Sequence, residues 1–220
     1  MTRTLATALT TVLLIAGAHA PAFAAGMQGD IDQAADVIER FRDMPEQGIP
    51  DRVIRDAKGF AILTVLKAGF MFSGQGGTGV VIARTPRGWS APSAIATGGA
   101  GFGFQVGAEV TEFVLVLNTT AAVQAFAHGG NVSFGGAVSA AAGPMGRTIG
   151  ANLMPVAAVY TYSRSQGVFA GVSIEGTVIV ARNDANREYY GRPVTPQAIL
   201  SGRVRPPAGA GRLRSALARL

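Results

Sequence analysis

The chain has 220 residues, of which 48% are hydrophobic and only 15% are charged. This composition excludes an intrinsically disordered chain and supplies enough apolar side chains for one packed domain. Residues 25–200 carry equal numbers of acidic and basic side chains, so beyond Arg3 the net positive charge comes from five C-terminal arginines: Arg203, Arg205, Arg212, Arg214 and Arg219. The basic character therefore belongs to the C-terminal end and not to the body of the domain.

Residues 1–24 have the features of a secretory signal peptide. Arg3 precedes an apolar run, Leu9–Ala18, that is too short to span a bilayer. We expect cleavage after Ala24, with Ala20 as the alternative, while a retained N-terminal anchor helix stays open. The chain has no cysteine, which excludes a lipoprotein anchor and disulfide bonds. These features predict an exported protein, either periplasmic or secreted.

Two helices and a strand are predicted before the glycine-rich part of the chain. Apolar residues recur at helical spacing over residues 28–43, with Asp30 as a candidate N-cap. A second, short helix is expected over residues 51–58, ending at Gly59. Residues 60–67 form a continuous apolar run, which is typical of a buried strand.

Glycine is unusually frequent, with 30 residues, and many lie between Lys67 and Gly107. Phe102, Phe104 and Val106 alternate there with glycines, so a strand would have one apolar face and one nearly bare face. A bare face lets another backbone approach closely or bends the sheet into a barrel.

The rest of the chain continues this pattern of short strands and helices. The predicted strands are 78–84, 89–97 with an interruption at Pro92, 112–118, an alternating segment over 131–142, and a hairpin of 156–164 with 168–182 around residues 165–167. The predicted helices are 119–128, 183–190, 195–200 and 212–220. The sum is an α+β fold, in which a large, glycine-rich, antiparallel, barrel-like sheet of roughly seven to ten short strands is flanked by N-terminal and C-terminal helices.

The residues that carry enzyme chemistry are scarce. His128 is the one histidine outside the signal segment, and at a helix end it is expected to contact the last carbonyl groups. One histidine without cysteine argues against a metal site. The sequence Gly74–Gly79 fits Gly-x-Gly-x-x-Gly, but a strand follows it where a nucleotide site needs a helix. We therefore predict no catalytic residues, no metal and no cofactor.

Three acidic residues lie in the sheet region, and two of them could form a carboxylate pair. Glu109 and Glu175 fall on small-residue faces, where buried ion pairs with Arg147 or Arg164 are the favoured interpretation. A glycosidase-type pair of Glu109 and Glu175 is the alternative.

The C-terminal arginines indicate a different kind of partner. No aromatic residues are interleaved with them, which argues against nucleic acid. Their amphipathic helix suits an anionic lipid surface, and a solvated tail is the alternative.

Six segments in succession resemble the signatures of the SYLF domain family. They are KGFAILTVLKAGFMFSGQGGTGVVIAR (58–84), GWSAPSAI (88–95), GGAGFGFQVGAE (98–109), SAAAGPMGR (139–147), YTYSRSQGVFAGVSIEG (160–176) and YYG (189–191). The resemblance covers about residues 31–220. It implies a lipid-binding domain for anionic phospholipids, with actin binding in the eukaryotic members, and it gives five candidate headgroup contacts: Lys58, Lys67, Arg84, Arg147 and Arg164.

Together these observations predict three parts: a signal peptide (1–24), one SYLF-like domain (25–205) and a basic C-terminal helix or tail (206–220). The expected function is that of a non-enzymatic, exported protein that binds anionic phospholipids as a peripheral membrane protein of the cell envelope. The alternative is a structural or protein-interaction module, whose glycine-rich sheet faces bind an envelope protein partner.

Overall fold

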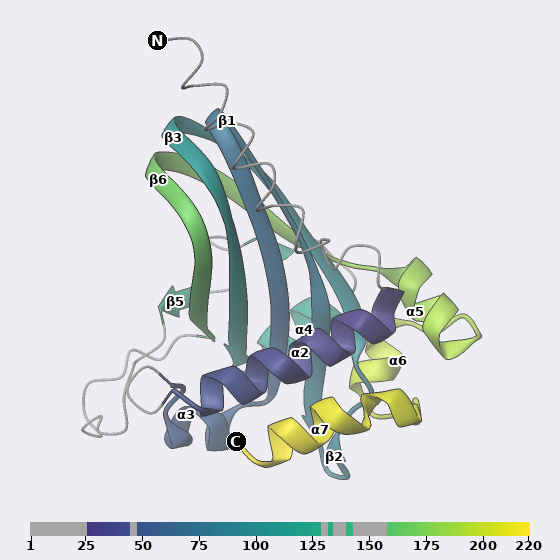
Figure 1. The fold of residues 1–220 in the computed structure, drawn as a ribbon. Helices are drawn as coiled ribbons and strands as arrows, with labels where there is room; N and C mark the ends of the chain where they lie inside the picture. The colour runs from purple at the N-terminus through teal and green to yellow at the C-terminus, as the bar shows by residue number, and fades with distance from the viewer. Residues whose placement is uncertain (1–25, 45–47, 129–131, 134–139, 143–157) are drawn as a thin grey trace, which may run out of the picture.

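The computed structural model describes residues 26–44, 48–128, 132–133, 140–142 and 158–220 (Figure 1). The fold is α+β, as the sequence predicts. In chain order the elements are α2 (Gly26–Arg42), α3 (Asp51–Asp56), β1 (Gly59–Thr85), β2 (Gly88–Trp89), β3 (Ser93–Leu117), α4 (Thr120–Ala127), β4 (Val132–Ser133), β5 (Ala140–Ala142), β6 (Val159–Ala181), α5 (Asn183–Tyr190), α6 (Pro196–Leu200), a 3₁₀ turn (Ala208–Ala210) and α7 (Gly211–Ala218).

One sheet contains all the described strands, in the order β2-β1-β3-β6-β4, and β5 pairs with β6 in parallel. The other neighbouring pairs are antiparallel. The path has two ends, so the sheet is open and the expectation of a barrel-like sheet is wrong.

Three long strands replace most of the short ones expected. β1 joins the predicted strands 60–67 and 78–84, and its glycine-rich middle stays paired with β3 except for a register shift between Phe70 and Phe72. The glycines lack side chains but keep their amide and carbonyl groups, so the ladder continues through them. The sequence pattern indicated breaks where the backbone is still paired.

The predicted hairpin at residues 165–167 is also wrong. β6 runs through this segment without reversing, and Ser165 and Gly167 pair with Thr111 and Glu109 of β3. Gly167 has a φ of +133°, a conformation that favours glycine. The glycine therefore marks an irregularity inside a strand, and the continuous partner strand β3 keeps β6 extended.

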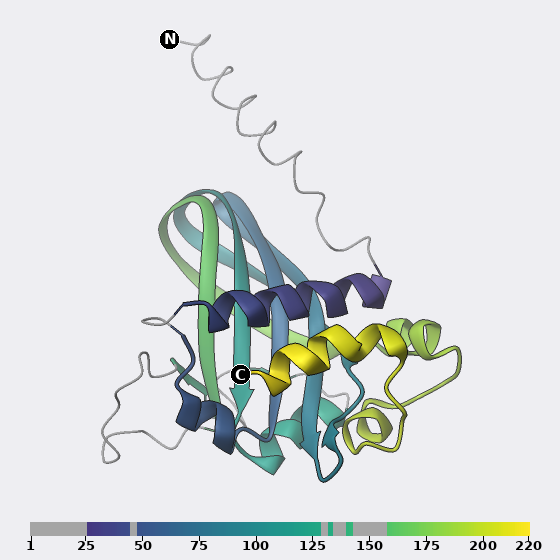
Figure 2. The ribbon, with the colours of Figure 1, turned by 60° about the horizontal axis from the view of Figure 1, so that its bottom comes forward.

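Each long strand bends over at one end of the molecule, which is the top of Figures 1 and 2. In β1 the two ends meet again, since the Arg84 amide donates to the Lys58 carbonyl at 2.8 Å. A Cβ added at Gly77 would collide with the Thr64 carbonyl, and one at Gly79 with the Ile62 carbonyl. The two halves of β1 thus cross at backbone distance, which confirms the predicted close approach at these two glycines.

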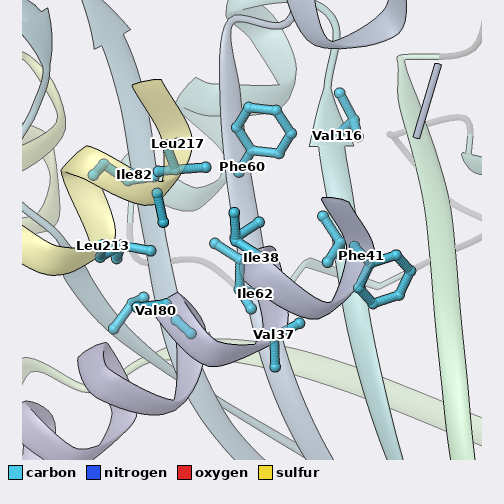
Figure 3. Packing of buried hydrophobic residues seen from close by; sticks show 14 of the residues in the cluster. Val37, Ile38, Phe41, Phe60, Ile62, Val80, Ile82, Val116, Leu213 and Leu217 are labelled. Carbon is cyan, nitrogen blue, oxygen red and sulfur yellow. The ribbon is translucent and has the colours of Figure 1, made fainter. Parts of the chain in front are cut away.

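The core lies around the lower half of the sheet, on both of its faces. One face packs against α2 and α7, which lie side by side across it (Figures 2 and 3). Phe60 and Ile62 of β1 point there, together with Ile38 of α2 and Leu213 of α7. Alternate residues such as Leu63 contribute to the second cluster with Phe126 of α4 and Leu200 of α6. Burial on both faces explains why the strand ends are continuous apolar runs.

Most helix boundaries follow the predicted signals. Thr119 and Thr195 cap α4 and α6 by accepting hydrogen bonds from backbone amides, and Gly191 ends α5 in the left-handed conformation. Asp30 as the N-cap of the first helix is wrong: α2 begins at Gly26, and Asp30 lies in its interior. No helix in the described part of the chain has the length and apolar character needed to cross a bilayer.

Candidate functional site

An ion pair with a buried carboxylate joins α2 to the residue between β6 and α5. The Asp30 carboxylate of α2, only 3% exposed, accepts a hydrogen bond from the Thr78 hydroxyl at 2.6 Å and pairs with Arg182 at 2.9 Å. Burial raises the pKa of Asp30, against the smaller, opposite effects of Thr78 and Arg182. No open cavity adjoins these groups, so their arrangement is that of a structural link.

Glu112 is the centre of a second charged cluster. It accepts two hydrogen bonds from Arg40 of α2, at 3.1 and 2.5 Å, and lies 3.5 Å from Arg164 of β6. Arg164, a predicted headgroup contact, therefore shares a largely buried carboxylate with a second arginine. The sequence favours Glu109 or Glu175 as the acidic partner of Arg164, whereas the partner in the structure is Glu112.

The C-terminal helix is part of the folded body. Leu213 and Leu217 of α7 are buried in the core beside α2. On its other face, Arg212 pairs with Asp36 and Glu39 at 2.5 and 2.8 Å, and Arg219 contacts Glu39 at 3.4 Å. Arg214 donates to the Trp89 carbonyl at 3.2 Å. Three of the five C-terminal arginines are thus held by groups of this chain.

The structure brings four of the basic candidates, Lys58, Arg84, Arg203 and Arg205, together with Arg87 at the end of the molecule that carries β2. Lys58 and Arg84 are joined there by their backbones, and the Arg87 guanidinium donates to the Gly202 carbonyl at 3.2 Å. Val204 is buried beside Ala91, and on either side of it Arg203 and Arg205 are exposed. We call this group the basic end: Lys58, Arg84, Arg87, Arg203 and Arg205.

The five side chains of the basic end differ in the contacts that their charged groups make. Arg84 donates to the carbonyls of Ile54 and Ala57, and its guanidinium lies 4.6 Å from the centre of the Trp89 ring. That geometry fixes the arginine in place. Among the ion pairs of the described residues, none involves any of these five side chains.

The other sequence candidates do not join the basic end. Lys67 pairs in register with Glu109, nine residues further along β1 than Lys58, which is about 30 Å of extended strand. Arg147 lies outside the described residues, and so does the side chain of Glu175. The five predicted headgroup contacts therefore do not form one site.

His128 lies at the C-terminal end of α4, and its ring Nδ1 is 2.7 Å from the Gln124 carbonyl. This is the contact with a terminal carbonyl that the sequence predicts. Among the residues that the structure describes, no group of three histidine, aspartate or glutamate side chains is placed to hold a metal ion.

The structure also reveals a surface that the sequence interpretation missed. Phe70 and Phe72, at the bend of β1, are 72% and 69% exposed, and Val106, the register partner of Phe70, is 55% exposed. The sequence signal for this surface is that Phe70 and Phe72, two residues apart, lie in a glycine-rich strand. The sequence pattern does not show where β1 bends, so it does not show that these side chains lie beyond the core.

Comparison with known proteins adds the family. Residues 98–220 match the family model Ysc84, described as Las17-binding protein actin regulator. The chain belongs to the Ysc84, or SYLF-domain, family. The match covers more than half of the chain, including most of β3, all of β6 and the helices α5, α6 and α7. This confirms the resemblance inferred from the sequence segments.

Relatives of this Ysc84-family chain extend over most of its length. LAS seventeen-binding protein 3 of Saccharomyces cerevisiae is 54% identical over 167 residues, which is 74% of this chain and 36% of the yeast protein. SH3 domain-containing YSC84-like protein 1 of Homo sapiens is 45% identical over 192 residues, which is 84% of this chain and 56% of the human protein. The chain thus spans about a third to a half of these relatives' lengths. No solved structure matches it.

Proposed function

We propose that this chain is a non-enzymatic lipid-binding protein that acts at anionic phospholipid surfaces. The observation that carries the proposal is the basic end, where five cationic side chains gather without a local ion pair. Each lysine or arginine near an anionic surface contributes about 1 kcal/mol to binding. Several such contributions, acting from one rigid end of the molecule, are sufficient for peripheral association.

The distribution of the other charges supports this choice of surface. Arg40, Arg164, Arg182 and Arg212 lie in the middle of the molecule and face carboxylates of the same chain. Their charges are largely compensated at short range. The basic end is a part of the described surface whose cations have no such partner, so a positive field can act from it on a membrane.

The compartment is part of the proposal. The signal-like segment of residues 1–24 and the absence of cysteine favour export to a bacterial envelope. Phosphatidylglycerol or cardiolipin would then be the anionic lipid. The engaged ring of His128 and the structural pairing of Asp30 and Glu112 support a binding role and offer no acid–base pair for catalysis.

The test is co-sedimentation with phosphatidylglycerol-containing vesicles and with neutral phosphatidylcholine vesicles. Binding is expected to be stronger on the anionic vesicles and to weaken as salt is raised. Arg203→Ala with Arg205→Ala should lower anionic binding by roughly tenfold or more. The matched control is Arg212→Ala with Arg219→Ala, which removes the same charge from arginines already paired with Asp36 and Glu39.

Two results would contradict the proposal. One is equal binding to anionic and neutral vesicles. The other is an equal loss for both pairs of substitutions, which would mean that total charge, and not the basic end, governs association.

A second candidate function is a protein-interaction module. It is favoured by the names of the relatives, among them the LAS seventeen-binding protein of yeast. Gly77 and Gly79 are covered by backbone of the same chain, so a partner would have to use open positions such as Gly74 and Gly98. Capture of one stoichiometric envelope protein by the purified chain, without any vesicle binding, would favour this function over the first.

A further inference from the structure

The bend of β1 places large apolar side chains at the end of the molecule opposite the basic end. Gly69 lies against the Phe72 carbonyl and Ser73, so the strand reverses its direction between them. Figures 1 and 2 show the bends of β1, β3 and β6 together at one end and β2 at the other. We call the exposed side chains of this bend the apex: Phe70, Phe72 and Val106.

Two of the three strands that bend at the apex, β1 and β3, carry no charged residue there. In β1 the residues from Ala68 to Ala83 contain no Asp, Glu, Lys, Arg or His, and in β3 the same holds from Ser93 to Ala108. The nearest charges on these two strands are Lys67 and Glu109, which pair in register below the bend. From Lys67 to Met71 β1 rises about 13 Å without a charged residue. The third strand, β6, carries Glu175, which pairs in register with Gly101 and whose side chain lies outside the described residues.

The backbone of the apex is paired on both sides of the bend. β1 pairs with β3 up to Phe70 and Val106, and again from Phe72 and Phe102 onward. β3 remains paired with β6 through the same region, from Gly101 to Gly107. Among the described strands, β1 pairs at the apex with β3 alone, so the phenylalanine side chains, and not the edge of the strand, are the part that can enter hydrocarbon.

We propose that the apex inserts into the apolar region of a lipid bilayer, as a contact separate from the basic end. Exposed phenylalanine side chains gain most where they are surrounded by acyl chains, and here they lie on a strand without a charged residue from Ala68 to Ala83. This contact requires no anionic headgroup. It goes beyond the proposed binding to anionic surfaces and can be tested independently of it.

The shape of the apex argues against a protein occupant. A stable protein interface buries on the order of 800 Å² on each partner. The apex is a narrow, convex bend of a few strands (Figure 2), and a second copy of this chain would present the same convex surface to it. A bilayer surrounds a narrow projection on all sides and needs no complementary shape.

Substitution of the phenylalanines provides the first test. Phe70→Ser with Phe72→Ser should leave the fold intact, because both side chains are exposed, and should lower binding to neutral phosphatidylcholine vesicles on the order of tenfold or more. The matched control is Val178→Ser with Val180→Ser, two exposed apolar residues of β6 that pair with Gly98 and Ala96, away from the bend. Equal binding by wild type and the apex variant would overturn the proposal.

A fluorescent label provides the second test and locates the contact. The chain has no cysteine, so Gly74→Cys introduces a single labelling site beside Phe72, at an exposed position where an added Cβ meets no atom. Gln124→Cys, exposed on α4, is the control site. An environment-sensitive label at residue 74 should shift to shorter wavelength on vesicles and be quenched by lipid-borne quenchers, at low and high salt, while the label at residue 124 should not.

The outcomes separate this inference from the proposed function. Vesicle binding with a water-exposed label at residue 74 overturns apex insertion alone. Loss of neutral binding in the apex variant, with salt-sensitive anionic binding retained, supports both. Absence of binding to any vesicle overturns both, and a dimer that forms through the apex in solution assigns the surface to a second copy and overturns the insertion.

Discussion

At the scale of single residues, the glycines of β1 fall into two physical classes. Gly77 and Gly79 face the backbone of residues 62–65, where there is no room for a side chain. Gly74 faces open space, and Gly98 has only the Gln75 carbonyl, at 4.0 Å. The same residue type is therefore required for packing at one position and replaceable at another, although the sequence pattern is the same.

Gly79→Ala should destabilise the protein by about 1–3 kcal/mol, because the new methyl group meets the Ile62 carbonyl, which cannot rotate away as a side chain would. Gly74→Ala adds the same methyl group without a collision and should change stability little. The measurement is the free energy of unfolding in urea. Equal stability of the two variants would contradict the close crossing of the β1 halves.

Asp30 gives a residue-scale prediction about pH. Burial raises its pKa in the folded state above the ordinary value of 3.8. At pH values between 3.8 and this raised pKa, the folded state holds a proton that the unfolded state has released. The contribution of Asp30 to the free energy of unfolding is therefore present below about pH 4 and is lost as pH rises through the raised pKa. The Asp30→Asn side chain cannot ionise, so this variant should lack the pH-dependent contribution of residue 30 to stability.

The comparison is the free energy of unfolding of wild type minus that of Asp30→Asn, measured from about pH 3 to pH 7. The difference should fall as pH rises. A difference that grows over the same interval would show that the Arg182 ion pair outweighs burial at this site.

At the scale of the elements, α7 shows how a basic segment can be structural. Its leucines fill the space between α2 and the sheet, and its arginines then lie next to the acids of α2. Apolar packing holds the helix in place, while exposed ion pairs contribute little. The docked helix leaves Arg203 and Arg205, in the preceding segment, as the exposed C-terminal cations of the basic end.

Leu213→Ala should therefore cost about 2–5 kcal/mol, since it leaves a cavity in the core, whereas Arg219→Ala should cost less than about 1 kcal/mol. Thermal and chemical denaturation of both variants would check this. Wild-type stability of Leu213→Ala would indicate that the C-terminal helix does not contribute to the core.

At the scale of the whole molecule, the three long strands pass through two environments. Their lower halves are covered on both faces by helices, and the bend carries exposed side chains. The lower halves have many buried contacts that resist local unfolding, and the bend has fewer, although the same strands run through both. The basic end and the apex lie at opposite ends of this body (Figure 1).

Amide hydrogen exchange should reflect this division. Amides of residues 60–65 and 80–83 are expected to exchange slowly, near the rate of global unfolding, and those of residues 68–76 faster, through local opening. Mass spectrometry of peptides from the two regions would measure it. Adding vesicles should slow exchange at residues 68–76 if the apex inserts, and uniform protection without vesicles would contradict two environments.

The sequence by itself determined the fold class, the family and the ends of some helices, whereas the expected end of the second helix at Gly59 is wrong, since α3 ends at Asp56 and Gly59 begins β1. These depend on local chemistry: Thr119 and Thr195 cap helices with their own hydroxyls, Gly191 adopts a left-handed conformation, and the strand ends are apolar because both faces are covered. The sequence also predicted that backbone approaches backbone in the glycine-rich stretch, but not that Gly77 and Gly79 are the positions where it does so.

Only the tertiary structure decided the number of strands, the partners of the charges and the functional surfaces. Whether the chain turns at residues 165–167 depends on β3, which continues the ladder past them. Glu112 meets Arg40 and Arg164 because a helix crosses two strands there, and Lys58 comes close to Arg84 because β1 folds back on itself. Contacts between residues distant in the chain depend on the course of the backbone, which a local pattern of residue types does not predict.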